Sequence, residues 1–223
     1  LVVSTGETYP KLATKIEAYL RYLFGFSPKV ELVNHALAHV YGAYFSSGYK
    51  ESLIISIDGL GDGISTMVAE GNNEEVEVIY RSGSGKLNES LGTFYAAFTN
   101  YLGFPQCEGE YKVMGMAAYG NNQYCLDEFL SINQDPFEIK VNPLLTVKDK
   151  WTVSSAFEPC VNYDVLEMKG IPSRAVNKPF EQKHFDLAHS VQKKYEEIVA
   201  DGNIVIGITG PHSIYGYIYW GRG

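Results

Sequence analysis

Apolar residues recur at the three- and four-residue intervals of a helix in several parts of the chain. The ranges with this pattern are residues 8–24, 90–102 and 185–200. In the second range, the residues at positions i, i+3, i+4 and i+7 predict one stripe that packs against a sheet. They are Phe94, Ala97, Phe98 and Tyr101. Further helices are predicted over 35–48, which a Ser-Ser-Gly run ends, and over 123–132.

Three short apolar runs predict consecutive antiparallel strands joined by turns. They are residues 53–58, 65–70 and 76–81. The strand Leu53–Ile57 is predicted to be central and buried, with Ser65–Ala69 antiparallel to it, because five apolar or small residues in a row cannot all face solvent. Short strands are also predicted at 30–34 and in the tail. Residues 135–180 contain many prolines and show no period, which predicts an insertion or lid of loops and short strands.

The composition permits a sizeable core and disfavours two kinds of partner. The chain has 223 residues, 45% of them hydrophobic, enough for one large domain or two small ones. Its formal net charge is -8 and it has no basic run, so a nucleic-acid groove is disfavoured. No apolar run reaches the roughly 18 residues of a membrane helix, and no signal peptide is visible. Three scattered cysteines predict reduced thiols in a cytoplasmic protein.

Two histidines four residues apart are the first candidate for chemistry. His35 and His39 lie on one face of the predicted helix, close enough for both imidazoles to reach one divalent ion. Ala36 and Ala38 beside them leave room for another element. Taken alone, this spacing is more typical of ordinary surface or core histidines than of ligands.

The glycine-rich stretch DGLGDG, residues 58–63, is the second candidate. Glycines at positions 59, 61 and 63 expose backbone N–H groups that suit phosphate oxygens. Asp58 or Asp62 would hold a metal or orient a nucleophile. The competing interpretation is a hairpin turn, because Asp-Gly is a favoured two-residue loop.

The third candidate is EGEYKVMGMAAYG, residues 108–120. Glu108, Glu110 and Lys112 lie within five residues, ahead of an apolar segment that glycine interrupts. A solvated loop with an internal ion pair explains this charge pattern equally well, so the stretch gains interest only together with the other two.

Four stretches, taken in order, resemble the N-terminal region of the carbamoyltransferase family, which includes nodulation, cephamycin and tobramycin carbamoyltransferases. They are NHALAHVYGAYFSSGY, LIISIDGLGDG, ESLGTFYAAFTNYLGF and EGEYKVMGMAAYG. The family pattern is an H-x-x-H-A helix, a strand that ends in DG-x-G, then SLG-x-x-Y-x-AFT-x-YLGF and EGEYKVMG-x-A-x-YG. The likeness covers roughly residues 30–200, and the last two motifs are long, ungapped and specific.

The resemblance implies an α/β chain with part of an actin-like ATPase fold, which is the sugar-kinase, Hsp70 and ribonuclease H-like architecture of a mixed sheet flanked by helices. Members of the family move a carbamoyl group from carbamoyl phosphate, through a carbamoyl-adenylate, to a hydroxyl of a sugar or natural product such as an antibiotic. ATP with Mg²⁺ is the implied nucleotide. The acceptor is a small molecule, and the oligomeric state is left open, with a homo-oligomer among the options.

The family pattern also implies roles for individual residues. His35, His39 and Asp58 would ligate a divalent metal, Fe²⁺ first and Zn²⁺ or Mn²⁺ as alternatives, and Asp58 would act in catalysis. Nucleotide or phosphate binding would fall to Gly59, Gly61, Asp62 and Gly63. Substrate binding would fall to Glu108, Glu110, Tyr111 and Lys112.

The chain departs from the family pattern in several places. Asn34 stands where the family often has the first of two adjacent histidines. The family's N-terminal phosphate hairpin, its GG-x-A-x-N turn and a later aspartate of the metal site have no counterpart. We therefore expect residues 1–198 to form a partial actin-like domain with 135–180 as the insertion or lid, and residues 199–223 to begin a C-terminal adenylate-forming domain.

Two functions follow from this pattern. The first is a partial O-carbamoyltransferase that binds metal weakly and transfers no carbamoyl group alone. The second is a non-catalytic fragment that binds a partner or complements the missing half in trans. An intact phosphate hairpin and GG-x-A-x-N turn in the full reading frame would favour the first.

Overall fold

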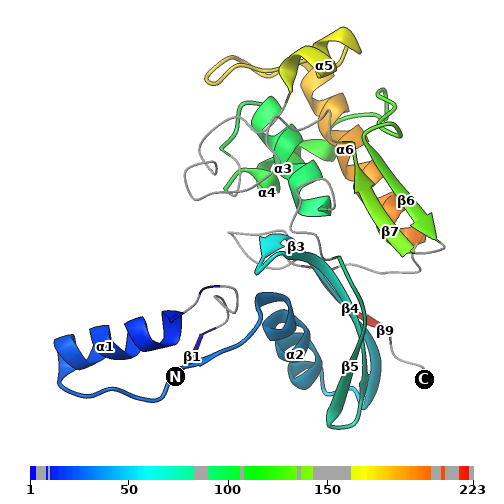
Figure 1. Ribbon diagram of the computed structural model, residues 1–223. Coiled ribbons are helices and arrows are strands. Elements are labelled where there is room, and N and C mark those ends of the chain that lie inside the picture. The colour runs from blue at the N-terminus through cyan, green and yellow to red at the C-terminus, as the bar shows by residue number, and fades with distance from the viewer. Residues whose placement is uncertain are drawn as a thin grey trace.

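The computed structural model describes residues 1–3, 9, 11–82, 90–105, 108–134, 137–142, 162–201, 207–208 and 216–220. Within the predicted insertion or lid, residues 135–136 and 143–161 lie outside these ranges, and so do Cys107 and Cys160. Within them the chain is an α/β structure in which helices lie on both sides of a sheet (Figure 1). No helix in this part of the chain is long and apolar enough to cross a membrane.

The central sheet has five strands. In spatial order they are β5 (Glu75–Arg81), β4 (Ile64–Asn72), β3 (Glu51–Gly61), β9 (Gly216–Trp220) and β8 (Gly207–Ile208). Each described pairing in this sheet is antiparallel. Ile54 lies opposite Ala69 and Ile57 opposite Thr66, so the predicted central strand and its partner are confirmed. β9 falls in the tail, where the sequence predicts a second domain, and here it is hydrogen-bonded to β3.

A two-residue turn joins β3 to β4. Asp62 and Gly63 have φ angles of 51° and 81°, as a type I′ hairpin turn requires at both central positions. The predicted six-residue turn is too long, because β3 continues past Asp58 through Gly59 to Gly61. The pairing with β4 becomes irregular in this last part of β3.

The helix α2 (His35–Ser47) covers one face of β3 and β4. Its small buried residues allow close packing, and together with strand residues they form a separate hydrophobic cluster. The cluster consists of Ala36, Val40, Ala43, Tyr44, Ile54, Ile64, Met67 and Ala69. The hydroxyl of Tyr44 donates to the carbonyl oxygens of Lys50 and Asn73, and this fixes the far end of α2 to both strand connections.

The helix α3 (Leu91–Tyr101) lies against the other face of the sheet, together with α4 (Glu110–Ala117) and α6 (Gln182–Asp201). Ten of the eleven residues of α3 are buried. The predicted stripe is confirmed, since all four of its side chains are fully buried in the large cluster on this face. α3 begins at Ser90, whose side chain accepts the N–H of Thr93.

The helix predicted over 123–132 is wrong. Residues 121–126 are irregular, and Leu130–Gln134 form the strand β6, which pairs with β7 (Phe137–Val141). Side chains at four-residue intervals along α6 hold the irregular segment instead: the residues are Gln182, Asp186, Ser190 and Lys194. EGEYKVMG, in contrast, forms most of α4 and is not a loop.

The first residues of the chain form an arm beside this body. The arm, residues 11–33, contains α1 (Leu12–Phe24) and β2 (Glu31–Leu32), and β1 (Val2–Val3) pairs with β2 in parallel. Figure 1 shows α1 projecting away from the sheet. The predicted helix is confirmed, but none of its side chains is fully buried. A short helix, α5 (Tyr163–Met168), precedes α6 at the opposite end of the molecule.

Candidate metal centre

The two predicted histidine ligands occupy the first turns of α2. Asn34 is the N-cap of this helix, because its side chain accepts a hydrogen bond from the N–H of Leu37. The helix therefore begins at His35, and the four-residue interval brings His39 to the same face. Asp58 follows the buried run of β3 directly. The residue that departs from the family pattern, Asn34, has a structural task in placing the pair.

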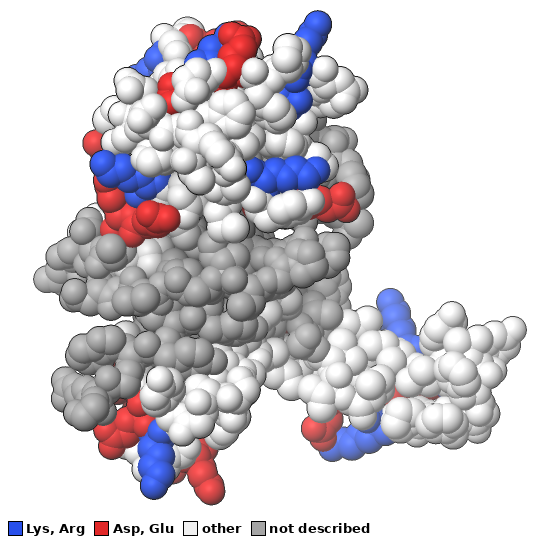
Figure 2. Space-filling view, turned by 180° about the vertical axis from the view of Figure 1, so that it is seen from behind, with Lys and Arg blue, Asp and Glu red and all other residues white. Residues whose placement is uncertain are grey.

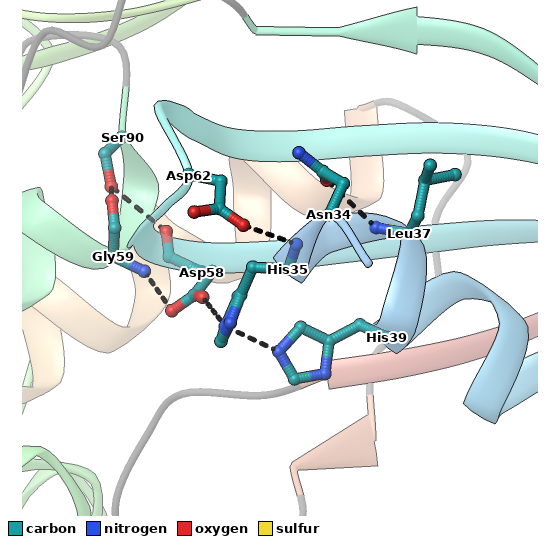
Figure 3. Close-up of polar contacts among 8 residues, drawn as sticks. All are labelled: Asn34, His35, Leu37, His39, Asp58, Gly59, Asp62 and Ser90. Carbon is teal, nitrogen blue, oxygen red and sulfur yellow. Dashed lines mark hydrogen bonds and ion pairs between the residues drawn. The ribbon is translucent and has the colours of Figure 1, made fainter. Parts of the chain in front are cut away.

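The side chains of His35, His39 and Asp58 converge on one point (Figure 3). Nε2 of His35 lies 2.8 Å from Oδ2 of Asp58 and 3.0 Å from Nε2 of His39. One possible ligand atom from each residue lies within 4.8 Å of the other two. Among the described residues, this is the one group of three such side chains close enough to hold a metal ion.

The contacts within this group cannot all be hydrogen bonds of neutral histidines. A neutral imidazole carries one proton, so Nε2 of His35 is either a donor or an acceptor. As a donor it cannot serve both the carboxylate of Asp58 and Nε2 of His39 along one N–H direction. As an acceptor it points its lone pair at the negatively charged carboxylate of Asp58, and this contact is repulsive. A divalent cation at the convergence point would satisfy all three atoms.

The distances fit such an ion after a small adjustment. Bonds of about 2.0–2.1 Å in a tetrahedral site place neighbouring ligand atoms roughly 3.3 Å apart. The two measured separations, 2.8 and 3.0 Å, are shorter by a few tenths of an ångström. Two imidazole nitrogens and one carboxylate oxygen suit Fe²⁺, Zn²⁺ and Mn²⁺ alike.

Electrostatics favour the ligand form of His39. Burial lowers the pKa of His39, the adjacent His35 lowers it further, and Asp58 opposes both effects. His39 is therefore neutral at pH 7, as a metal ligand must be. The side chains of His35 and Asp58 expose 23% and 13% of their surface, so solvent reaches the site.

The connection between β3 and β4 places His35. A Cβ on Gly61 would lie 2.2 Å from Cδ2 of His35, so a side chain there would displace the ring. Oδ2 of Asp62 accepts the backbone N–H of His35 at 3.0 Å. A carboxylate at this position also interacts favourably with the N-terminus of α2. Asp62 thus ties the hairpin to the helix that carries the histidines.

The start of α3 supports Asp58 from the other side. The hydroxyl of Ser90 lies 3.1 Å from the carbonyl oxygen of Asp58 and 2.5 Å from that of Gly59. A Cβ on Gly92 would lie 2.7 Å from the nitrogen of Gly59, so glycine permits this close approach. Oδ1 of Asp58 accepts the N–H of Gly59, which leaves Oδ2 toward His35. The sequence gave no signal of this bridging contact.

The predicted substrate-binding residues lie on a different element. Glu110, Tyr111 and Lys112 form the first turn of α4, and Glu108 precedes it on the surface. The ammonium group of Lys112 lies over the rings of Phe104 and Tyr111, at 5.4 and 5.7 Å from their centroids. Their role in substrate binding stays a prediction, as does phosphate binding by the glycines of β3 and its turn.

Comparison with known proteins gives a consistent result. A family model of the carbamoyltransferase N-terminus matches residues 3–210. The nodulation protein NolNO of Sinorhizobium fredii is 32% identical over 171 residues, and the nodulation protein NolO of Bradyrhizobium diazoefficiens is 32% identical over 167. An uncharacterized protein of Synechocystis sp. is 27% identical over 175 residues. These alignments cover 75–77% of this chain and 22–27% of the relatives, so the chain spans about a quarter of their length.

Proposed function

The chain belongs to the carbamoyltransferase family, and we propose that it supplies the metal-binding part of an O-carbamoyltransferase. The observation that carries this proposal is the convergence of His35, His39 and Asp58. They come from two elements and meet at 2.8 and 3.0 Å, within the region that the family model matches.

The proposed reaction moves a carbamoyl group from carbamoyl phosphate, through a carbamoyl-adenylate formed with ATP and Mg²⁺, to a hydroxyl of a sugar or natural product. The proposed fold is part of an actin-like ATPase. Its support is a meander of three antiparallel strands with α2 on one face and α3 on the other. A sugar hydroxyl, which the family resemblance implies, is the first acceptor to test.

In this proposal the chain's own side chains prepare a site for the ion. His35, His39 and Asp58 provide the ligand atoms, with Fe²⁺ as the first candidate and Zn²⁺ or Mn²⁺ as alternatives. A bound ion would act as a Lewis acid toward a carbamoyl or phosphate oxygen. The N–H of Gly59 and the hydroxyl of Ser90 orient Asp58 and its strand, so that Oδ2 keeps its direction before any ion arrives.

The anionic co-substrates are assigned to groups nearby in sequence. Backbone N–H groups of Gly61 and the Asp62–Gly63 turn are proposed to meet phosphate oxygens. The first turn of α4 is proposed to hold the substrate, with the exposed Tyr111 and Lys112 as its contacts. Lys112 supplies a positive charge in a chain whose net charge is -8.

Metal titration of the purified chain tests the proposal. Fe²⁺, Zn²⁺ and Mn²⁺ are titrated by calorimetry into wild type, His35→Ala and His39→Ala. We expect each substitution to weaken binding at least about tenfold, which corresponds to about 1.4 kcal/mol. His189→Ala on α6 is the matched control and should bind like wild type. Bound metal should also raise the melting temperature of wild type but not of the two site variants. Equal affinity in all four proteins would exclude the assigned ligands.

A further inference from the structure

A stripe of large apolar side chains lies on the solvent side of α1. Tyr19, Tyr22 and Leu23 fall at positions i, i+3 and i+4, and Phe24 and Phe26 continue the apolar surface past the end of the helix. Their exposed fractions run from 48% for Leu23 to 84% for Tyr22. Contiguous exposed apolar surface of this kind marks an interaction site more often than scattered single residues do.

The rest of the arm is basic at its surface. Lys11, Lys15 and Arg21 are exposed. The acids of the arm are engaged locally, since Glu31 pairs with Lys29 at 2.6 Å and Glu17 accepts the N–H of Val30. The arm therefore presents an apolar stripe beside positive charge, and Figure 2 shows it as a projection separate from the body.

The opposite pattern occurs on the sheet, at the end far from α3. In the register of β4 and β5, Glu70 lies directly opposite Glu77, and Asn72 lies opposite Glu75. Directly opposed residues of antiparallel strands share a face. Glu51, which lies opposite Asn72 on β3, belongs to the same face. All four glutamates are exposed, and together they define the acidic sheet face.

No described helix covers the acidic sheet face, which carries an unfavourable charge arrangement. α2 packs on the other face, against Ala69, Val76 and Val78. On the same side, Val68 belongs to the large cluster, and Tyr80 and Leu53 are partly buried against it, so the helical layer ends at the edge of this face. Like charges directly opposite one another in a sheet are destabilising, so this face would be stabilised by a basic partner. Figure 2 shows acidic side chains, with a basic one between them, at the lower end of the body.

We propose that the arm of one protomer docks on the acidic sheet face of a second copy, and that the contact is reciprocal. Lys15, four residues before Tyr19 on the same face of α1, would meet Glu70 and Glu77, and the apolar stripe would lie on exposed Ile79 and on the accessible part of Leu53, which lies opposite Glu70 on β3. A two-fold axis relates the two contacts, as in most homodimers. Opposite charges would set the register, and the aromatic side chains would supply most of the affinity.

The area available is sufficient for a stable dimer. A large aromatic side chain buries roughly 150–250 Å² when it is fully covered. Each arm offers four exposed aromatic rings and one leucine, and the dimer uses two arms. Even partial coverage brings the total, with the receiving faces, into the range of about 1,200–2,000 Å² that specific interfaces bury.

Sedimentation velocity of the purified chain tests the proposal at about 1–100 µM. Wild type should sediment with twice the chain mass of 24.8 kDa. Tyr22→Asp should raise the dimer dissociation constant at least about tenfold. The matched control is Met168→Asp on α5, an equally exposed residue at 80%, and it should stay dimeric. Circular dichroism of both variants checks the fold.

A charge exchange tests the receiving face separately. Lys15→Glu should weaken the dimer, and adding Glu77→Lys to the same chain should restore it, because the two charges simply exchange places. A monomeric wild type at about 100 µM would overturn the proposal. A dimer insensitive to Tyr22→Asp would do the same. A dimer that Lys15→Glu breaks and Glu77→Lys does not restore would place the arm on another surface, such as the second arm, and would reject the sheet contact.

Discussion

The two faces of the central sheet differ in how they are covered. The face under α3 belongs to a cluster that also includes α4, α6 and residues of β6 and β7. The face under α2 belongs to a much smaller cluster made from one helix and the strands alone. The candidate metal centre lies at the edge of this thin side, with part of its surface open to solvent. Stability and function are therefore expected to respond to different substitutions.

On the thin side, the face under α2, packing depends on the close approach of helix and strands more than on large side chains. Glycines let side chains of α2 lie against the strands: Gly61 makes room for the ring of His35, and Gly71 for the ring of Tyr44. The thick side instead buries an aromatic core in which Phe98 contacts the rings of Phe94 and Phe129. Removing volume should harm the thick side, and adding volume should harm the thin side.

The largest effect is expected from Phe98→Ala. The side chain is completely buried in the large cluster, so its removal costs the transfer free energy and leaves a cavity, together about 3–5 kcal/mol. Urea melts measure the loss. Met168→Ala, at an 80% exposed position of α5, is the control and should change stability by less than about 0.5 kcal/mol. A loss under about 1 kcal/mol for Phe98→Ala would show that the α3 layer is not the stabilising side.

Gly61→Ala should have the next largest effect, on binding more than on stability. The new Cβ would meet the ring of His35 at 2.2 Å, so the ring must turn out of the metal centre. We expect metal affinity to fall at least about tenfold and stability to fall by about 1–3 kcal/mol. Calorimetry and urea melts report the two quantities.

Gly42→Ala is the matched control for this substitution. Gly42 lies in the same helix as His35, and a Cβ there meets nothing within 4 Å. Alanine in a helix interior should stabilise the protein by about 0.5–1 kcal/mol without affecting metal binding. If both glycine variants bound metal equally well, the close approach of Gly61 would not position His35.

The local sequence was sufficient to predict the structure where the apolar pattern lies within one helix or one pair of strands. The buried strand Leu53–Ile57 with its antiparallel partner and the aromatic stripe of α3 were predicted because each depends on residues a few positions apart. The hairpin at Asp62–Gly63 was one of two interpretations of DGLGDG. The exact extent of β3 was missed, because its last residues are set by contacts with α2 and α3.

The failures lie where distant contacts decide the structure. Ser190 accepts the N–H groups of Gln123 and Tyr124, which holds this segment in irregular form although its sequence permits a helix. The helix α4 was missed because Gly109 and Gly115 make EGEYKVMG resemble a loop, and its packing against α6 overrides that local preference.

In the candidate metal centre, too, local spacing predicts one part of the geometry and distant contacts decide the rest. The shared face of His35 and His39 follows from their spacing, whereas their distance to Asp58 depends on how α2 lies against β3. The family resemblance supplied that pairing before the structure did. The support from Asp62 and Ser90 has no signature in the spacing of residues.

A smaller effect is expected from Asp62→Ala. Loss of the acceptor for the N–H of His35 leaves the first turn of α2 without this contact, which should cost about 0.5–2 kcal/mol. Asp62 also has a positive φ of 51°, which asparagine tolerates, so Asp62→Asn should keep the turn and lose only part of this amount. Urea melts of both variants separate the loss of the hydrogen bond to His35 from a disturbance of the turn. Equal losses would assign the effect to the carboxylate charge.

The smallest effect is a pH dependence of stability that arises from His184 on the thick side. His184, in the first turn of α6, is buried in the thick layer, where its Nδ1 accepts the N–H of Glu181 and its Nε2–H therefore donates to the carbonyl oxygen of Ser173. Burial lowers the pKa of His184, and the positive charges of Lys183 and Arg174 also lower it. The hydrogen bond to the carbonyl of Ser173 and the negative charge of Glu181 raise it, but the net shift is downward.

A lowered pKa means that the unfolded chain takes up the proton first. Above pH 6.5 His184 is neutral in both states and contributes no pH dependence; below it, the unfolded state binds more protons and the free energy of unfolding falls as the pH falls. We expect urea melts in EDTA to show this decline from pH 6.5 downward. His39 should contribute in the same direction, because burial lowers its pKa as well. His184→Asn, whose amide can still accept the N–H of Glu181, should therefore make the decline shallower without removing it. Near pH 8 the free energy of unfolding of this variant should not change with pH. An unchanged slope in this variant would mean that the thick layer does not sense pH through His184.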